Sequence, residues 1–172
     1  MRRIGRRAAG LVGDVFEIPI DDGRVAYGQI VAERMKTHLM VVFRTAYERG
    51  ANPDLTEIVN DDIAFMAESF DGKIWNGHWP IIGNVKPDLS RIPLPVYKLT
   101  VDRVDNWQVV SYDGLRRRPA TRGEREALEP RLLVAPIILE RAVQALHGTA
   151  PWDESYRPLE YETVRKSAEV KV

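Results

Sequence analysis

The chain has 172 residues, 44% of them hydrophobic and 29% charged, a composition that excludes a disordered protein and an integral membrane protein. Acidic and basic residues balance at 25 each and cysteine is absent, so the chain lacks the cationic excess that draws proteins to nucleic acid or anionic lipid, and it has neither disulfides nor cysteine-ligated zinc. The length suits one domain over residues 1–172, with a core at about 12–147 and a tail at 149–172.

The N-terminal stretch has four arginines, but the apolar run after Arg7 is only about six residues long. A secretory signal needs roughly 7 to 15 apolar residues and a membrane helix about 20. We therefore expect a cytoplasmic protein.

A turn sequence with apolar runs on both sides indicates a β-hairpin near the N-terminus. The turn is Asp-Asp-Gly at residues 21–23. We expect Gly23 at positive φ, because glycine adopts the conformation of a tight turn at little cost. Pro19 indicates that the first strand lies at an edge or carries a bulge, and Gly28 marks a bend or a bulge in the second.

Further strands are predicted where β-branched and aromatic residues are concentrated, at residues 37–47, 96–101 and 107–114, the last of them closed by an Asp-Gly turn. The stretch 52–73 has features of a helix, capped by Asn52 or Asp54, and also of a strand. Its type stays open at this point.

Longer helices are predicted only late in the chain. Thr121 and Glu124 have the spacing of a capping box. Residues 135–148 carry an apolar face and end at a glycine; the face is formed by Ile138, Ala142, Ala145 and Leu146, and the glycine is Gly148. The pattern predicts an α+β fold, with a twisted antiparallel sheet or a partly open β-barrel on the N-terminal side and helices in the C-terminal third.

The sequence lacks the motifs that specify common enzymes and metal sites. His38, His78 and His147 lie about forty or more residues apart, without the short spacings of a zinc site. No serine lies in a Gly-x-Ser-x-Gly elbow, and no glycine-rich phosphate loop occurs. We therefore expect no catalytic residue, no metal and no cofactor.

The stretch WNGHWPIIGN, residues 75–84, is the most distinctive in the chain. Its two tryptophans either stack on a ligand or partner, or fill the core, which the adjoining Pro-Ile-Ile favours. His78 is either a general base or pH switch, or a turn residue that bonds a carbonyl group. Of the two tryptophans, we expect Trp79 in the core and Trp75 at the surface.

Charge is distributed unevenly along the chain. Residues 48–73 have an excess of about five negative charges, because only Arg49 and Lys73 oppose seven acids: Glu48, Asp54, Glu57, Asp61, Asp62, Glu68 and Asp71. Such a segment either steers a basic protein partner or is a solvated acidic face. The basic run at residues 116–122 either contacts phosphates or lies in a solvated loop.

Three stretches, in this order and spacing, resemble the immunity protein 26 family of bacterial polymorphic toxin systems: GDVFEIPIDDGRVAYGQIV at 13–31, GHWPIIGN at 77–84 and RRRPATRGEREALE at 116–129. The resemblance spans most of residues 12–147. It implies a cytoplasmic inhibitor that binds a toxin and is not an enzyme. It also implies a role in maintaining the fold for Gly13, Gly23, Gly28, Trp79, Pro80 and Gly83.

We therefore predict an immunity protein that neutralises a cognate toxin by non-covalent binding. The expected partner is a toxin with a basic surface, and neither a membrane nor nucleic acid is expected. The expected binding residues are Trp75, His78, Asp54, Glu57, Asp61, Asp62, Glu68 and Asp71. Two alternatives remain open: a small β-barrel module that binds nucleic acid or a small ligand through Tyr27, Trp75 and Arg116–Arg118, and a hydrolase that uses His78 with Asp61 or Asp62.

Overall fold

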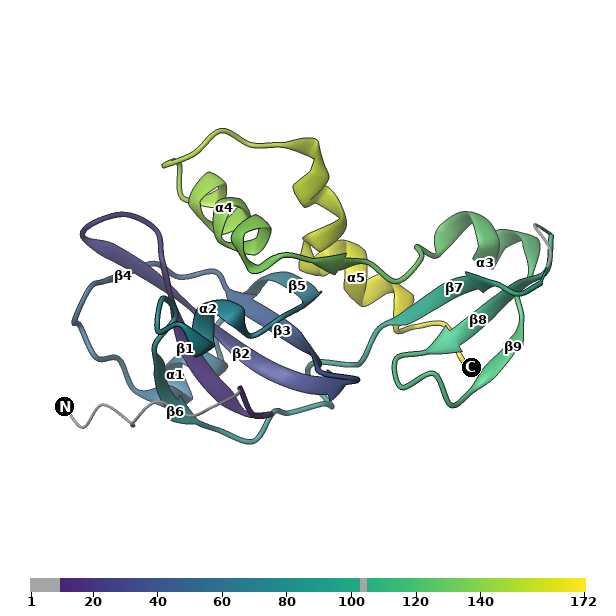
Figure 1. The fold of residues 1–172 in the computed structure, drawn as a ribbon, viewed down its shortest axis with the longest axis horizontal. Coiled ribbons are helices and arrows are strands. Elements are labelled where there is room, and N and C mark those ends of the chain that lie inside the picture. Colours follow the sequence, from purple (N-terminus) through teal and green to yellow (C-terminus); the bar gives the residue numbers. More distant parts are fainter. Residues whose placement is uncertain (1–9, 103–104) are drawn as a thin grey trace. The chain divides into compact units, whose positions relative to one another are not determined.

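A computed structural model describes residues 10–102 and 105–172 (Figure 1). Over these residues the chain forms ten strands in two separate sheets, and it divides into two compact units. Of the described residues, unit 1 contains 10–87 and Leu133–Tyr161, and unit 2 contains 88–102, 105–132 and Glu162–Val172. The α+β class is confirmed, with an open sheet on the N-terminal side and the longer helices toward the C-terminus.

The sheet of unit 1 has the order β10-β5-β3-β2-β1-β6, and β4 pairs with β2 outside this path. Its pairings are antiparallel except for that of β10 with β5, which is parallel. The strands are β1 (Asp14–Pro19), β2 (Arg24–Arg34), β3 (Thr37–Phe43), β4 (Tyr47–Glu48), β5 (Ile63–Ser69), β6 (Ile81–Asn84) and β10 (Leu133–Val134). The predicted hairpin and third strand are therefore present. β6 pairs only with residues 14–16 of β1, so Pro19 lies where β1 has no neighbour on that side.

A side chain, and not a left-handed glycine, organises the turn between β1 and β2. The Asp21 carboxylate accepts hydrogen bonds from the backbone N–H groups of Gly23 (3.0 Å) and Arg24 (2.7 Å). Gly23 has no positive φ, so that prediction is wrong, because an aspartate bonded to the backbone two residues on forms the turn without it. Positive φ occurs instead in the next turn, at Met35 (49°) and Lys36 (67°).

The segment at residues 52–73, whose sequence has features of both a helix and a strand, contains a helix and then a strand. Asp54, not Asn52, is the N-cap of α1 (Leu55–Val59), and its carboxylate accepts a hydrogen bond from the N–H of Thr56 at 2.7 Å. β5 follows α1, and the short helix α2 (Gly72–Trp75) follows β5. No helix among the described residues is both long and apolar enough to cross a bilayer.

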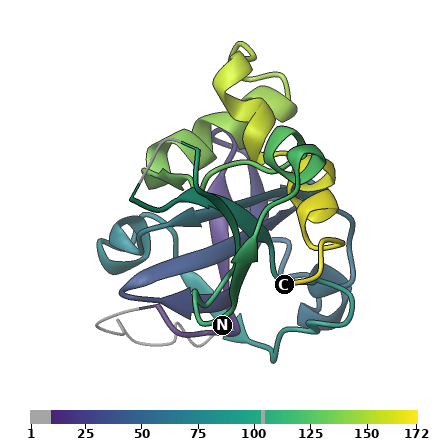
Figure 2. The same ribbon diagram turned by 90° about the vertical axis from the view of Figure 1, so that its right-hand side faces the viewer.

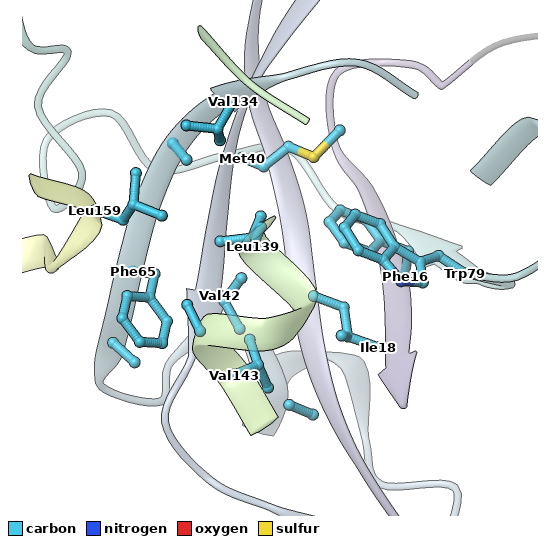
Figure 3. Packing of buried hydrophobic residues seen from close by; sticks show 14 of the residues in the cluster. Phe16, Ile18, Met40, Val42, Phe65, Trp79, Val134, Leu139, Val143 and Leu159 are labelled. Atoms are coloured by element: carbon cyan, nitrogen blue, oxygen red, sulfur yellow. The ribbon is translucent and has the colours of Figure 1, made fainter. Parts of the chain in front are cut away.

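Helix α4 (Pro136–Leu146) packs on one face of the sheet of unit 1 (Figure 3). Leu139, Ala142 and Val143 are fully buried against the sheet, and Gly148 (φ 78°) follows the C-terminus of the helix. The 3-10 helix η1 (Glu154–Leu159) adds Tyr156 and Leu159 to the same core cluster. Part of the C-terminal tail therefore belongs to the core of unit 1.

The small residues Gly28 and Gly83 make room for larger side chains. A Cβ atom on Gly28 would lie 2.6 Å from the ring of Phe16, its direct partner on β1. A Cβ atom on Gly83 would collide with the side chain of Leu55 on α1. Both glycines are thus fixed by close packing and not by their backbone conformation.

Unit 2 is built on a small antiparallel sheet of β7 (Val96–Thr100), β8 (Trp107–Ser111) and β9 (Arg117–Pro119). Helix α3 (Arg122–Ala127) begins at Thr121 with the predicted capping box to Glu124. Helix α5 (Tyr161–Ser167) leads into the C-terminal residues. Val170 and Val172 pack against the buried cluster of Val96, Val109 and Leu128.

Candidate functional site

The stretch that begins at Trp75 forms a tight, closed loop after β5. The backbone N–H of Trp75 donates to the carbonyl of Asp71 at 2.8 Å, and the N–H of Trp79 donates back to the carbonyl of Lys73 at 2.9 Å. Gly77, at φ 74°, allows the chain to reverse between them. The loop is therefore closed by its own backbone before β6 begins at Ile81.

Trp79 anchors this loop in the core. It is fully buried, and its ring stacks on that of Phe16 with centroids 5.4 Å apart and planes 6° from parallel (Figure 3). Its indole N–H donates to Oε2 of Glu140 on α4 at 2.8 Å. The ammonium group of Lys73 donates to the same oxygen at 2.6 Å and lies 5.9 Å from the centre of the indole ring.

Trp75 and His78 lie on the outside of the same loop. Trp75 is 56% exposed, which is unusual for so large an apolar side chain, and His78 is also exposed. Ile74, between Lys73 and Trp75, is buried in the core cluster. Helix α2 therefore exposes Trp75 to solvent, while the preceding residue, Ile74, is packed in the core.

The acidic residues expected at the binding surface separate into two groups. Asp54, Glu57, Asp61 and Asp62 precede β5, whereas Asp71 follows it. A seven-residue strand spans roughly 20 Å, so the first group and the Trp75 loop lie at opposite ends of β5. Figure 2 shows α1 and α2 on opposite sides of unit 1. The structure does not surround Trp75 with this acidic group.

Glu68 and Asp71 make contacts within the fold. Glu68 is 4% exposed, and one of its carboxylate oxygens accepts a hydrogen bond from the hydroxyl of Thr37 at 2.5 Å. The carboxylate of Asp71 accepts a hydrogen bond from the N–H of Gly10 at 3.0 Å. Of the expected acids, Asp54, Glu57 and Asp62 are the exposed ones.

A shallow groove beside α1 collects part of this negative charge. It is lined by Thr45, Tyr47, Thr56, Glu57, Asn60 and Asp61. Burial, followed by the nearby charges of Glu57 and Asp61, raises the pKa of Tyr47. Two carboxylates, those of Glu57 and Asp61, therefore line the groove.

Several of the residues named for the two alternative functions are buried or paired within their own unit. Tyr27 is 2% exposed, and burial, with the charge of Glu17 and the neighbouring Tyr47, raises its pKa to about 12. Arg118 forms an ion pair with Glu124 at 2.6 Å and also donates to the carbonyl of Lys171. His78 lies beyond the opposite end of β5 from Asp61, and among the described residues no three His, Asp or Glu side chains group as metal ligands.

The residues expected to maintain the fold can be placed individually. Gly13 has φ 94° and lies against the Asn84 side chain, so a Cβ atom there would meet Oδ1 at 2.8 Å. The carbonyl of Pro80 accepts a hydrogen bond from the N–H of Glu17 at 3.0 Å. Glu140 and Lys73, which hold the Trp75 loop, were missed as site residues. The only sequence signal was an acid at residue 140 beside the apolar face of a predicted helix.

The family model described as Immunity protein 26 matches residues 12–113, more than half of the chain. The match includes β1 and β2 with their hairpin, the Trp75 loop and β6, whereas the arginine-rich stretch at residues 116–129 lies beyond it. Neither the curated proteins nor the solved structures include a match. The matched residues contain the glycines and the buried tryptophan that shape the core of unit 1, and the chain belongs to the immunity protein 26 family.

Proposed function

We propose that the chain binds a cognate bacterial toxin in the cytoplasm and neutralises it by non-covalent inhibition, without chemical turnover. The observation that carries the proposal is the exposed Trp75 on a loop whose base is buried. Membership of an immunity protein family supports a toxin as the partner.

An exposed tryptophan on a fixed support has the properties of an interface anchor. Tryptophan is enriched among the residues that dominate binding energy, because its large ring loses much apolar surface to water when it enters a partner's pocket. The Trp75 loop is held by Ile74 in the core and by the hydrogen bonds to Glu140. Binding would therefore require little further ordering of the loop, and ordering is a main cost of association.

The acids beside α1 supply a second, electrostatic contribution. Asp54, Glu57 and Asp62 are exposed, and Glu57 also lines the groove together with Asp61. Complementary charge accelerates encounter and disfavours wrong partners more than it adds affinity. We therefore assign anchoring to Trp75 and steering of a basic toxin surface to the α1 acids.

Co-expression with a toxin candidate encoded by a neighbouring gene tests the proposal. The wild-type chain is expected to restore growth and to bind the purified toxin. Trp75→Ala is expected to weaken binding at least about 30-fold, the loss typical of an interface hot spot. Leu115→Ala is the matched control, because Leu115 is 84% exposed and belongs to unit 2. Equal affinity of the two variants would remove Trp75 as the anchor, and failure of the wild-type chain to protect would refute the function.

A further inference from the structure

We infer that Glu140, on α4, is a positioning residue that fixes the orientation in which Trp75 is displayed. One carboxylate oxygen of Glu140 joins the two ends of the Trp75 loop to a helix more than 60 residues further along the chain. Its importance for binding rests on the proposed function, whereas its effect on Trp75 itself does not.

The two residues that bracket Trp75 share this acceptor. Oε2 of Glu140 accepts hydrogen bonds from Nζ of Lys73, two residues before Trp75, and from the indole N–H of Trp79, four residues after it. Glu140 is 8% exposed and belongs to the same unit as the loop. Within this short loop, the chain before Trp75 and the chain after it are both fixed from one point.

Because this contact is buried, neither the carboxylate nor its donors can be replaced by water without cost. A carboxylate withdrawn from water must have partners, and Lys73 and Trp79 supply a positive charge and a neutral donor in one place. The backbone N–H of Trp79 also donates to the carbonyl of Lys73, so the backbones of the two residues whose side chains meet Glu140 are joined directly. Removing the negative charge leaves a partly buried ammonium group without its partner, and Lys73 is then expected to turn toward water and release α2.

The core does not need the contact between Lys73 and Glu140 in order to bury Trp79. The ring of Trp79 is already held by its stack on Phe16, which involves neither Glu140 nor Lys73. The ion pair therefore adds little to the burial of Trp79, but it restrains Lys73 and with it the four-residue helix that carries Trp75. A helix of this length has no stability of its own, so its orientation depends on such contacts.

Fluorine NMR of protein labelled with 5-fluorotryptophan tests this directly. The chain has four tryptophans, and Trp75→Phe identifies the signal of Trp75. Glu140→Gln keeps the size of the side chain and an oxygen that can accept the indole N–H bond, but it removes the charge. We expect the Trp75 signal to shift and broaden in Glu140→Gln and in Lys73→Met, while thermal unfolding stays cooperative.

Glu124→Gln is the matched control, because it breaks the ion pair with Arg118, which has the same 2.6 Å separation but lies in unit 2. It is expected to leave the Trp75 signal unchanged. If Glu140→Gln does not fold, Lys73→Met decides the result, because the bond from Trp79 to Glu140 remains in it. An unchanged Trp75 signal in the folded variants, with or without a lower Tm, would overturn the inference.

Toxin binding supplies the second readout. Glu140→Gln is expected to lower affinity about tenfold through lost preorganisation, and to have no further effect once Trp75 is alanine, since the two act through the same contact. Full additivity of the two substitutions would contradict a positioning role. If the wild-type chain binds no toxin, the proposed function fails, and the NMR comparison still decides whether Glu140 positions Trp75.

Discussion

Phe16 and Gly28 are direct partners on β1 and β2, and the ring of Phe16 lies over the glycine backbone. A Cβ atom at residue 28 would lie 2.6 Å from the ring and 2.9 Å from the carbonyl oxygen of Val41. The same ring stacks on that of Trp79. Gly28 therefore determines how deeply Phe16 sits, and Phe16 in turn sets the position of the tryptophan that anchors the binding loop.

Gly28→Ala is expected to destabilise unit 1 by about 1 to 3 kcal/mol, the usual cost of overfilling a packed core. Urea denaturation followed by tryptophan fluorescence measures the free energy of unfolding. Gly123→Ala is the control, because a Cβ atom there meets nothing within 4 Å and alanine favours the helix α3. Gly28→Ala with the stability of the wild-type protein would show that Phe16 can move without cost.

The turn between β2 and β3 offers a stabilising change. Met35 and Lys36 both have positive φ, a conformation that costs ordinary residues energy and that Asn-Gly adopts readily. Replacing the pair by Asn-Gly is expected to raise the free energy of unfolding by about 1 kcal/mol. Met35 is 80% exposed, so no core contact is lost. Lys86→Gly, at an exposed position without positive φ, is expected to give no such gain.

Local signals in the sequence predicted much of the fold. The hairpin at residues 21–23 and the capping box at Thr121 depend on neighbours in the chain, and both are present. The left-handed residues were assigned to the wrong turn, because an Asp side chain replaced the glycine conformation at Gly23 and no glycine marks Met35. A local sequence cannot show which of these solutions the chain adopts.

The candidate site was predictable only where burial follows from composition. Trp79 beside Pro-Ile-Ile was expected in the core, and it is fully buried. Glu140 is 61 positions from Trp79 and 67 positions from Lys73 in the sequence. No local spacing therefore predicts that it supports the loop. Likewise, the acids of residues 48–73 looked continuous in sequence, but β5 places Glu57 and Asp71 at opposite ends of a strand.

His147 is expected to make stability depend on pH. Burial, followed by the positive charges of Arg24 and Arg44, lowers its pKa from the ordinary 6.5. Below pH 6.5 the folded protein therefore binds fewer protons at this residue than the unfolded chain does. The stability is fully present above pH 6.5 and is lost as the pH falls toward the lowered pKa. His147→Asn is expected to flatten this part of a plot of Tm against pH. An unchanged slope between pH 7.5 and 5 would exclude His147 as the cause.

Arg118 is expected to fasten the C-terminus to unit 2. It donates two hydrogen bonds to Glu124, at 2.8 and 2.6 Å, and two to the carbonyl of Lys171, at 2.8 and 2.6 Å. Lysine cannot reproduce this planar set of donors. Arg118→Lys should therefore increase hydrogen exchange at residues 168–172 and leave exchange in β1–β3 unchanged. The neighbouring Arg117→Lys is the control, because Arg117 is exposed and has no such contact to the C-terminal residues among the bonds described.

The acids beside α1 and the Trp75 loop should affect toxin binding in different kinetic steps. Glu57→Gln combined with Asp62→Asn is expected to lower the association rate constant about 3- to 10-fold at low salt. The dissociation rate constant should change little. The difference from wild type should shrink as salt rises, because exposed charges are screened over about 8 Å at physiological ionic strength. Trp75→Ala should instead accelerate dissociation at every salt concentration.

Glu126→Gln with Glu162→Gln removes the same charge from exposed positions of unit 2 and serves as control. Because the two groups lie at opposite ends of β5, their effects on affinity should add; strong coupling between them would mean that the toxin engages one continuous surface.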